Sequence, residues 1–265
     1  MQEEIGVEDM GGVAAGLVCD RFADGGWVRT PVHVPSEMEL TIYVNQQGLV
    51  TILCTPTKLS YLVLGFLYGE GIIEGPGDVV MMRMCEDESL ADVRLANPGY
   101  KLPQQRTITS GCGGGAVFKT HGEKVDSDLV AQPTKVLSLM AQLQEQMELY
   151  RRCGGVHTSA LSDTGNLLVV AEDIGRHNTL DKIQGECLAQ GLSTRDRLLL
   201  TTGRVSSEML LKAARMQAPV VVSRHSPTGS AVALARDLGI TLVGHARASR
   251  LLVYSHPERL GCLGN

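Results

Sequence analysis

The sequence predicts an α+β first half and, from about residue 125, an α/β sandwich around a largely parallel sheet. In the second half, short apolar runs alternate with segments whose apolar residues recur at helical spacing, a pattern typical of strand–helix units. In the first half, several strand-like segments surround one helical segment. The 265 residues provide enough chain for both parts, each with a core of its own.

The first half is predicted to hold a small α+β domain over residues 27–124, preceded by a loose segment over residues 1–26. That lead-in is rich in glycine and acidic residues and has little periodicity. Alternating apolar residues predict strands over residues 28–34, 39–45, 49–54, 79–84 and 91–95. Thr55 or Thr57 is expected to cap a helix that runs to the glycines around residue 70.

The second half, residues 125–265, is predicted to begin with one long helix over residues 125–150, in which apolar residues recur at helical spacing. Strands are then predicted over residues 167–171, 197–201, 220–222, 241–244 and 251–254. Helices are predicted over residues 179–189, 206–216 and 229–238. Ligands of open α/β sheets collect at the carboxyl ends of the strands, so the loops that follow these strands are the expected place for a site.

Composition argues against several classes of protein. The net charge of −5 and the low aromatic content (4%) disfavour a general nucleic-acid binder. No signal peptide and no membrane-spanning run is recognisable. The seven cysteines are scattered without a C-x-x-C pair, so neither a disulfide framework nor a zinc site is expected. A cytoplasmic protein fits these features best.

The stretch Thr107–Val117 places Cys112 among four glycines. Glycine-rich chain favours a loop that presents a small reactive group or lets a ligand approach the backbone. An exposed thiol in such a loop can attack, be attacked and carry sulfur between sites. The alternative is a glycine-rich turn with an incidental cysteine.

The loop Glu172–Asn178 gathers two carboxylates, a guanidinium, an imidazole and an amide. Helix capping by Asp173 or Asn178 would explain one or two of these groups. The density of the set favours a functional loop.

Hydroxyl groups and cations also follow the other predicted strands. Ser206, near Arg204, and Thr228, near Ser226, stand where helices begin, and such positions either bind phosphate or simply cap the helix. The loop cations are Arg176, His177, Lys182, Arg204, Lys212, Arg224, His225, Arg247 and Arg250. Their concentration in an acidic chain favours an anion pocket, with a solvated basic face as the alternative. His157 and Cys153 are weaker candidates, because a lone histidine beside a strand and a small cysteine are usually structural.

Taken together, these motifs resemble the formate dehydrogenase accessory sulfurtransferases (FdhD type). The resemblance runs from about Glu39 to Leu260. It rests on Val44–Asn45, Leu64–Ile73, Ser110–Gly113, Gly154–His157, Glu172–Lys182, Thr202–Met209, Ser226–Thr228 and Gly239–Gly244.

The resemblance implies a sulfurtransferase that formate dehydrogenase needs for activity. It implies that sulfur is accepted as a persulfide from a cysteine desulfurase and passed to a molybdenum or tungsten bis-molybdopterin guanine dinucleotide cofactor before the cofactor is inserted. The cofactor is then cargo, held through its GDP moiety, and no permanently bound cofactor or metal is expected. The resemblance further implies a cytoplasmic homodimer that contacts the catalytic subunit of formate dehydrogenase, and a three-layer C-terminal domain similar to the cytidine deaminase fold. The zinc signature of true deaminases is absent.

Carried over to this chain, the resemblance makes Cys112 the persulfide-bearing residue. It assigns cofactor binding to the segment His245, Ala246, Arg247, Ala248, Ser249 and Arg250, with Arg176, His177, Arg204, Ser206, Ser226 and Thr228 as further contacts. Many family members carry C-x-x-C in the cysteine loop, whereas this chain has Gly115 at the second position. A local disulfide cannot form there, so release of the sulfur would depend on the cofactor or on another thiol, for which Cys153 is the only nominee.

Two other hypotheses remain open at this stage. A chaperone would hold the cofactor and dock on apo-formate dehydrogenase without chemistry, and a nucleotide-binding α/β enzyme would have no role in sulfur transfer. Loss of function on replacing Cys112 separates the sulfurtransferase from both.

Overall fold

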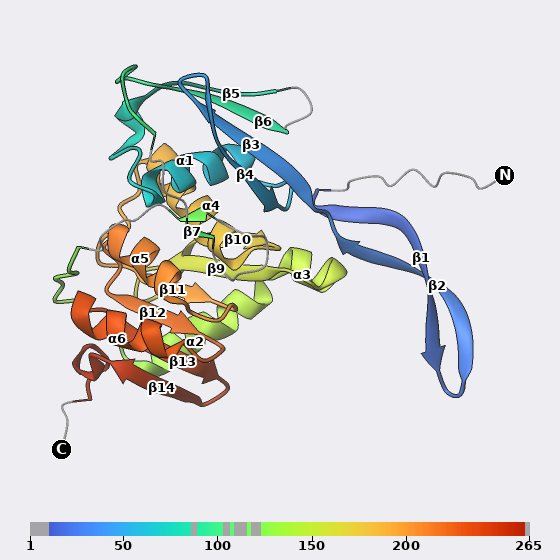
Figure 1. Ribbon diagram of the computed structural model, residues 1–265. Helices are drawn as coiled ribbons and strands as arrows, with labels where there is room; N and C mark the ends of the chain where they lie inside the picture. Colours follow the sequence, from blue (N-terminus) through green and yellow to red (C-terminus); the bar gives the residue numbers. More distant parts are fainter. Residues whose placement is uncertain (1–10, 86–88, 103–106, 109–115, 118–122, 263–265) are drawn as a thin grey trace.

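The computed structural model describes residues 11–85, 89–102, 107–108, 116–117 and 123–262 (Figure 1). Its largest sheet has six strands. In spatial order they are β10 (Leu167–Asp173), β9 (His157–Ser162), β11 (Leu198–Thr201), β12 (Val220–Ser223), β13 (Thr241–Arg247) and β14 (Arg250–Ser255). Strands β11, β12 and β13 run parallel, whereas β9–β10, β9–β11 and β13–β14 pair antiparallel. The expectation of a largely parallel sheet is therefore wrong, because two hairpins flank a short parallel centre.

Helices cover both faces of this sheet. On one face α2 (Pro133–Glu145) packs Val136 and Leu143 against a core that includes Leu200 and Val222. The other face is covered by α4 (Arg176–Gln190), α5 (Ser207–Arg215) and α6 (Gly229–Leu238). Because both faces of the sheet are buried, the central strands have continuous apolar sequences rather than alternating ones. The arrangement has three layers, as expected, and its likeness to the cytidine deaminase fold stays a prediction.

The single helix expected over residues 125–150 is wrong. Val125 and Ala131 lie before the start of α2, and their N–H groups donate to the carbonyls of Leu238 and Arg259. Helix α2 then ends at Glu145, and α3 (Glu148–Cys153) is a separate short helix. The Glu172 carboxylate accepts the N–H groups of Leu149 (2.7 Å) and Tyr150 (3.1 Å). A carboxylate that satisfies these otherwise unpaired donors stabilises a second helix start, which helical spacing alone does not reveal.

The first half forms a four-stranded sheet covered by α1 (Leu59–Gly69). Its strands, in spatial order, are β4 (Gln47–Cys54), β3 (Met38–Val44), β6 (Leu90–Leu95) and β5 (Val79–Met84). These strands and the helix confirm the predicted elements. The predicted threonine cap is wrong, since Lys58 occupies the N-cap position and makes no side-chain capping bond. The Thr55 hydroxyl instead accepts the N–H of Ile174 (3.1 Å).

Helices α1 and α4 cross in close contact between the two sheets (Figure 1). A Cβ atom on Gly65 would lie 1.8 Å from the carbonyl oxygen of Asp181, and one on Gly185 would lie 1.8 Å from that of Tyr61. Only glycine permits this separation of the helix axes, so the pair fixes how the first sheet sits against the second. Most of Leu64–Ile73 is buried here, so this segment belongs to the core.

Residues 1–26 were expected to form a loose lead-in, and this is wrong for the described part. Strand β1 (Val13–Ala23) pairs antiparallel with β2 (Gly26–Pro35) in a long hairpin that extends away from the other sheets (Figure 1). The period-2 signal of β1 is obscured in the sequence because most of its side chains are exposed. The domain boundary near residue 125 stays a prediction.

The remaining elements are short. They are the 3₁₀ turns η1 (Pro76–Asp78) and η2 (Pro257–Leu260) and the two-residue strands β7 (Thr107–Ile108) and β8 (Ala116–Val117). Across the described residues, every helix is too short or too polar to span a bilayer.

Candidate functional site

A cavity of about 280 Å³ opens at the carboxyl edge of the parallel strands. It is lined by Met147, Tyr150, Val156, His157, Thr202, Arg224, His225 and Arg247. Thr202 follows β11, Arg224 follows β12 and Arg247 ends β13, while His157 begins the antiparallel β9 at the same edge. This is where open α/β sheets bind ligands. The lining contains two guanidinium groups and two imidazoles, and no carboxylate among the described residues, so its chemistry suits an anion.

Buried hydroxyl groups hold the loops that line this cavity. The Ser223 hydroxyl donates to the carbonyl of Gly203 (2.7 Å) and accepts the N–H of His225 (2.9 Å). The Thr202 hydroxyl accepts the N–H of Thr158 (3.0 Å). Ser223 is fully buried and Thr202 nearly so. Because these polar groups have partners within the protein, the loops are shaped before any ligand arrives.

Arg176 lies directly behind His157, and Gly203 makes room for it. A Cβ atom on Gly203 would lie 2.9 Å from the Cβ of Arg176 and 3.5 Å from the Nδ1 of His157. The residue after Thr202 therefore has to be small if the loop after β11 is to pass over the first turn of α4. Arg176 is only 7% exposed, so its charge is poorly screened and acts on the cavity from behind.

Replacing Gly203 by alanine is expected to lower the free energy of unfolding by about 1–3 kcal/mol, because the added methyl overpacks the contact with Arg176. Urea denaturation measures the change. Gly229→Ala is the matched control, since its added Cβ meets nothing within 4 Å. Equal stabilities for the two variants would show that the contact with Arg176 does not constrain this loop.

The electrostatics of the cavity act most strongly on His157. Partial burial of its ring lowers the pKa of His157 below the usual 6.5, and the positive charges of Arg176, His225 and His177 lower it further, against a smaller opposing effect of Asp173. The ring is therefore neutral at pH 7 while no anion is bound.

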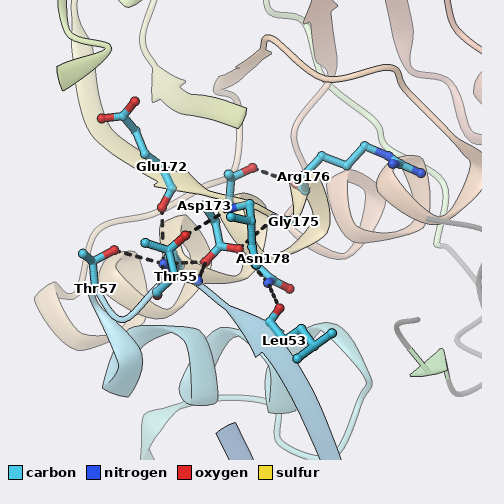
Figure 2. Close-up of polar contacts among 11 residues, drawn as sticks. Leu53, Thr55, Thr57, Glu172, Asp173, Gly175, Arg176 and Asn178 are labelled. Atoms are coloured by element: carbon cyan, nitrogen blue, oxygen red, sulfur yellow. Dashed lines mark hydrogen bonds and ion pairs between the residues drawn. The ribbon is translucent and has the colours of Figure 1, made fainter. Parts of the chain in front are cut away.

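The loop Glu172–Asn178 is mainly structural. Fully buried Asp173 lies 2.6 Å from the ammonium group of Lys182 and accepts the N–H groups of Thr55 (3.1 Å) and Gly175 (2.8 Å) and the amide of Asn178 (2.8 Å). Figure 2 shows this network joining the end of β4 to the start of α4, with the Arg176 side chain extending away from it. Within this loop, only Arg176 and His177 therefore remain as candidates for a role in binding.

Two of the predicted pocket cations are placed elsewhere. The ammonium group of Lys182 is fully buried and donates to the carbonyl of Thr55 and the hydroxyl of Thr57 (both 3.1 Å) as well as pairing with Asp173. Lys212 lies 2.6 Å from a carboxylate oxygen of Asp181. Their assignment to an anion pocket is wrong, because a buried ammonium needs a carboxylate partner within the fold.

His177 and Ser206 lie together, as part of a different contact. The Nε2 of His177 is 3.3 Å from the Ser206 hydroxyl and 3.2 Å from a carboxylate oxygen of Glu208. The hydrogen bond with His177 is the main cause of a lowered pKa for Glu208. His177 and Ser206 are absent from the cavity lining, and the adjacent Glu208 carboxylate would repel an anion.

The segment 245–250 is only partly brought to the cavity. Arg247 lines it, and the Nε2 of His245 lies 2.9 Å from the Ser226 hydroxyl beside it. The Ala246 side chain is fully buried in the core under α2, so Ala246 could contact a cofactor only through its backbone. Ala248, Ser249 and Arg250 are exposed at the turn between β13 and β14, outside the lining.

Two further predicted contacts are placed away from the cavity. Thr228 caps α6, and its hydroxyl accepts the N–H of Ala231 (3.2 Å), which confirms the alternative of a simple cap. Arg204 is exposed beyond the lining.

Cys112 lies outside the described residues. Cys153 is half-buried and its thiol lies within hydrogen-bonding distance of the carbonyl of Leu149 (3.2 Å). Burial raises the pKa of Cys153, and it raises those of Cys54 and Cys187 to about 12. All three thiols are therefore poor nucleophiles at neutral pH, which disfavours Cys153 as a second sulfur carrier.

The sequence indicates His157 only as a weak candidate and does not single out Thr202, although both line the cavity. Both face the cavity because β9 pairs with β11, an antiparallel contact in a segment to which no strand was assigned.

The comparisons with known proteins agree on one family. A model described as the FdhD/NarQ family matches residues 35–261. A sulfur carrier protein FdhD of Staphylococcus aureus (strain MRSA252) is 36% identical over 260 residues, covering 94% of this chain and 97% of its own length. A sulfur carrier protein FdhD of Bacillus subtilis (strain 168) is 38% identical over 249 residues, covering 91% and 95%.

A solved structure from Desulfotalea psychrophila, described as a formate dehydrogenase accessory protein, has the same fold. It superposes with a TM-score of 0.79 at 27% identity and covers 92% of this chain and 98% of its own.

Proposed function

We propose a function for this chain on the premise that it belongs to the FdhD/NarQ family: it carries sulfur for the maturation of a formate dehydrogenase. The cysteine that takes the sulfur is Cys112. The acceptor is a molybdenum or tungsten bis-molybdopterin guanine dinucleotide cofactor, which is bound as cargo before its insertion. The sulfur donor is a cysteine desulfurase, and the working form is a cytoplasmic homodimer.

The strongest support for this proposal is the cationic cavity. A guanine dinucleotide cofactor presents diphosphate groups, and diphosphates are recognised by guanidinium groups that donate paired hydrogen bonds. Arg224 and Arg247 line the cavity, and the positive charge of Arg176 also acts on it. The cavity therefore suits the phosphates of the GDP moiety.

Sulfur uptake follows the chemistry of thiol–disulfide exchange. The Cys112 thiolate attacks the outer sulfur of the donor persulfide. A new S–S bond forms on Cys112 as the bond to the donor cysteine breaks, and the donor leaves as a thiolate. Electrons and atoms balance without an additional oxidant.

Release of the sulfur as sulfide needs two electrons from another group. Gly115 provides no thiol in the same loop, and the raised pKa of Cys153 disfavours that residue. The cofactor or an external thiol is therefore assigned this step.

GDP binding tests the role of the cavity. The double variant Arg224→Gln/Arg247→Gln is expected to bind GDP at least about a hundredfold more weakly in calorimetry, because each of the two charge-assisted hydrogen bonds contributes about 1.5–3 kcal/mol and about 1.4 kcal/mol is a tenfold change. Arg195→Gln is the control, since Arg195 precedes β11 at the opposite edge and contacts Gln217. Unchanged affinity in the double variant would exclude this cavity as the nucleotide site.

A further inference from the structure

His157 differs from the arginines around it because its charge is not fixed. It stands at the first position of β9 and lines the cavity together with Arg224 and Arg247. Within the described part of the chain, neither ring nitrogen of His157 has a hydrogen-bond partner, although the ring is half-buried. Its hydrogen-bonding capacity is therefore available to whatever enters the cavity.

The fixed charges around His157 are mostly those of arginines. The charged and titratable groups that face it are Arg176 and His177 from α4, Arg224 and His225 after β12, Arg247 from β13 and Asp173 from β10. Asp173 is the only carboxylate in that set, and it is already paired with Lys182 at 2.6 Å. The Tyr150 phenol and the Thr202 hydroxyl complete the wall without charge. A proton on His157 is thus opposed by its neighbours in the free protein.

A bound phosphate would reverse this balance. In a cavity of about 280 Å³, two or more negative charges lie close to every lining side chain, including the His157 ring. In a partly desolvated site, an opposite charge within a few ångströms favours the protonated imidazole.

We propose that His157 binds the phosphate of the nucleotide as an imidazolium, so that the cavity takes up one proton with each diphosphate group that it binds. This inference rests on the proposed function and concerns the same cavity. The proton comes from solvent, and no covalent bond between heavier atoms forms or breaks. Neutral His157 keeps the free cavity from accumulating excess positive charge, and protonation completes the site only when an anion is present. The cavity then discriminates in favour of dianionic phosphate groups over weakly charged ligands.

The sign of the pH effect follows from linkage. In the free cavity the pKa of His157 is below 6.5, because of burial and the adjacent cations, and the bound anion raises it. Affinity for the nucleotide therefore rises as the pH falls from the pKa of His157 in the complex to its pKa in the free cavity. The limiting slope for one proton is about tenfold per pH unit, and the effect levels off below the pKa of the free cavity.

Calorimetry with GDP as the probe tests this inference. Binding is measured at several pH values between pH 5.5 and 8.5, an interval of about 1–2 units on either side of the ordinary histidine pKa. At each pH, buffers of different ionisation enthalpy are compared to give the number of protons taken up. The variants are His157→Gln, His225→Gln from the same cavity, and His256→Gln, whose ring contacts Glu258 and the carbonyl of Arg236 away from it.

The wild-type protein and His256→Gln are expected to take up protons with the same pH profile. His157→Gln is expected to lose the uptake above that of GDP itself and to show a flattened pH profile, with affinity reduced mainly at the acidic end. His225→Gln is expected to bind more weakly and to keep the uptake. GDP binding with the full wild-type uptake in His157→Gln would overturn this inference and leave the proposed function intact. Absence of GDP binding in the wild-type protein would overturn both.

Discussion

Replacing Lys182 by methionine is expected to lower the free energy of unfolding by about 3–5 kcal/mol, because it leaves the Asp173 carboxylate as an uncompensated buried charge. Both side chains are fully buried and their charged atoms are 2.6 Å apart. Lys182 also donates to groups at the end of β4, so the pair joins the first sheet to α4. Urea denaturation followed by circular dichroism measures the loss.

Arg94→Met is the control for this experiment. Arg94 and Asp92 form an ion pair at 3.1 Å, but their side chains are 40% and 29% exposed. An exposed pair contributes about 0–1 kcal/mol, so this variant is expected to remain close to the wild-type protein. A double variant, Asp173→Asn/Lys182→Met, is expected to recover part of the loss of Lys182→Met. If Lys182→Met were as stable as Arg94→Met, the buried pair would have no part in holding the two sheets together.

Replacing Cys112 by alanine is expected to abolish the ability of the protein to restore formate dehydrogenase activity. Alanine has no sulfur atom that could hold a persulfide, and the thiols of Cys54 and Cys187 are buried with their pKa values raised to about 12. The measurement is formate dehydrogenase activity in a bacterial host that lacks its own member of this family and expresses either protein.

Cys153→Ala is the matched control, because that thiol is half-buried and its pKa is raised. It is expected to restore activity as the wild-type protein does. GDP binding is measured on the same variants, and Cys112→Ala is expected to bind normally because the lining residues that the structure describes are unchanged. Full restoration by Cys112→Ala together with normal GDP binding would instead identify a chaperone that holds the cofactor without chemistry.

Strong periodicity made most elements predictable. Alternating side chains identify β3, β4 and β6, whose alternate residues are buried, and apolar runs identify β11, β12 and β13, which are covered on both faces. The hairpin strand β1 could not be found in the same way, because exposed side chains leave no apolar–polar contrast. The break between α2 and α3 was also invisible, since it depends on Glu172, which comes 23 residues after Leu149.

The residues of the candidate site were predictable only in part. The position of loops after parallel strands correctly indicated Arg224, His225 and Arg247 as members of a cationic cavity. Local sequence gives no sign that Lys182 and Lys212 are neutralised by Asp173 and Asp181, because these ion pairs form only when the helices pack. The contribution of His157 likewise depends on strand pairing that its neighbours in sequence do not reveal.

The most direct test of sulfur transfer is to locate the sulfur itself. The protein is incubated with a cysteine desulfurase and free cysteine, and its peptides are analysed by mass spectrometry without reductant. We expect one additional sulfur atom on the peptide that contains Cys112, removed by reduction and absent from Cys112→Ala. A desulfurase that is active towards free cysteine but leaves Cys112 unmodified would contradict the proposal that this chain carries sulfur.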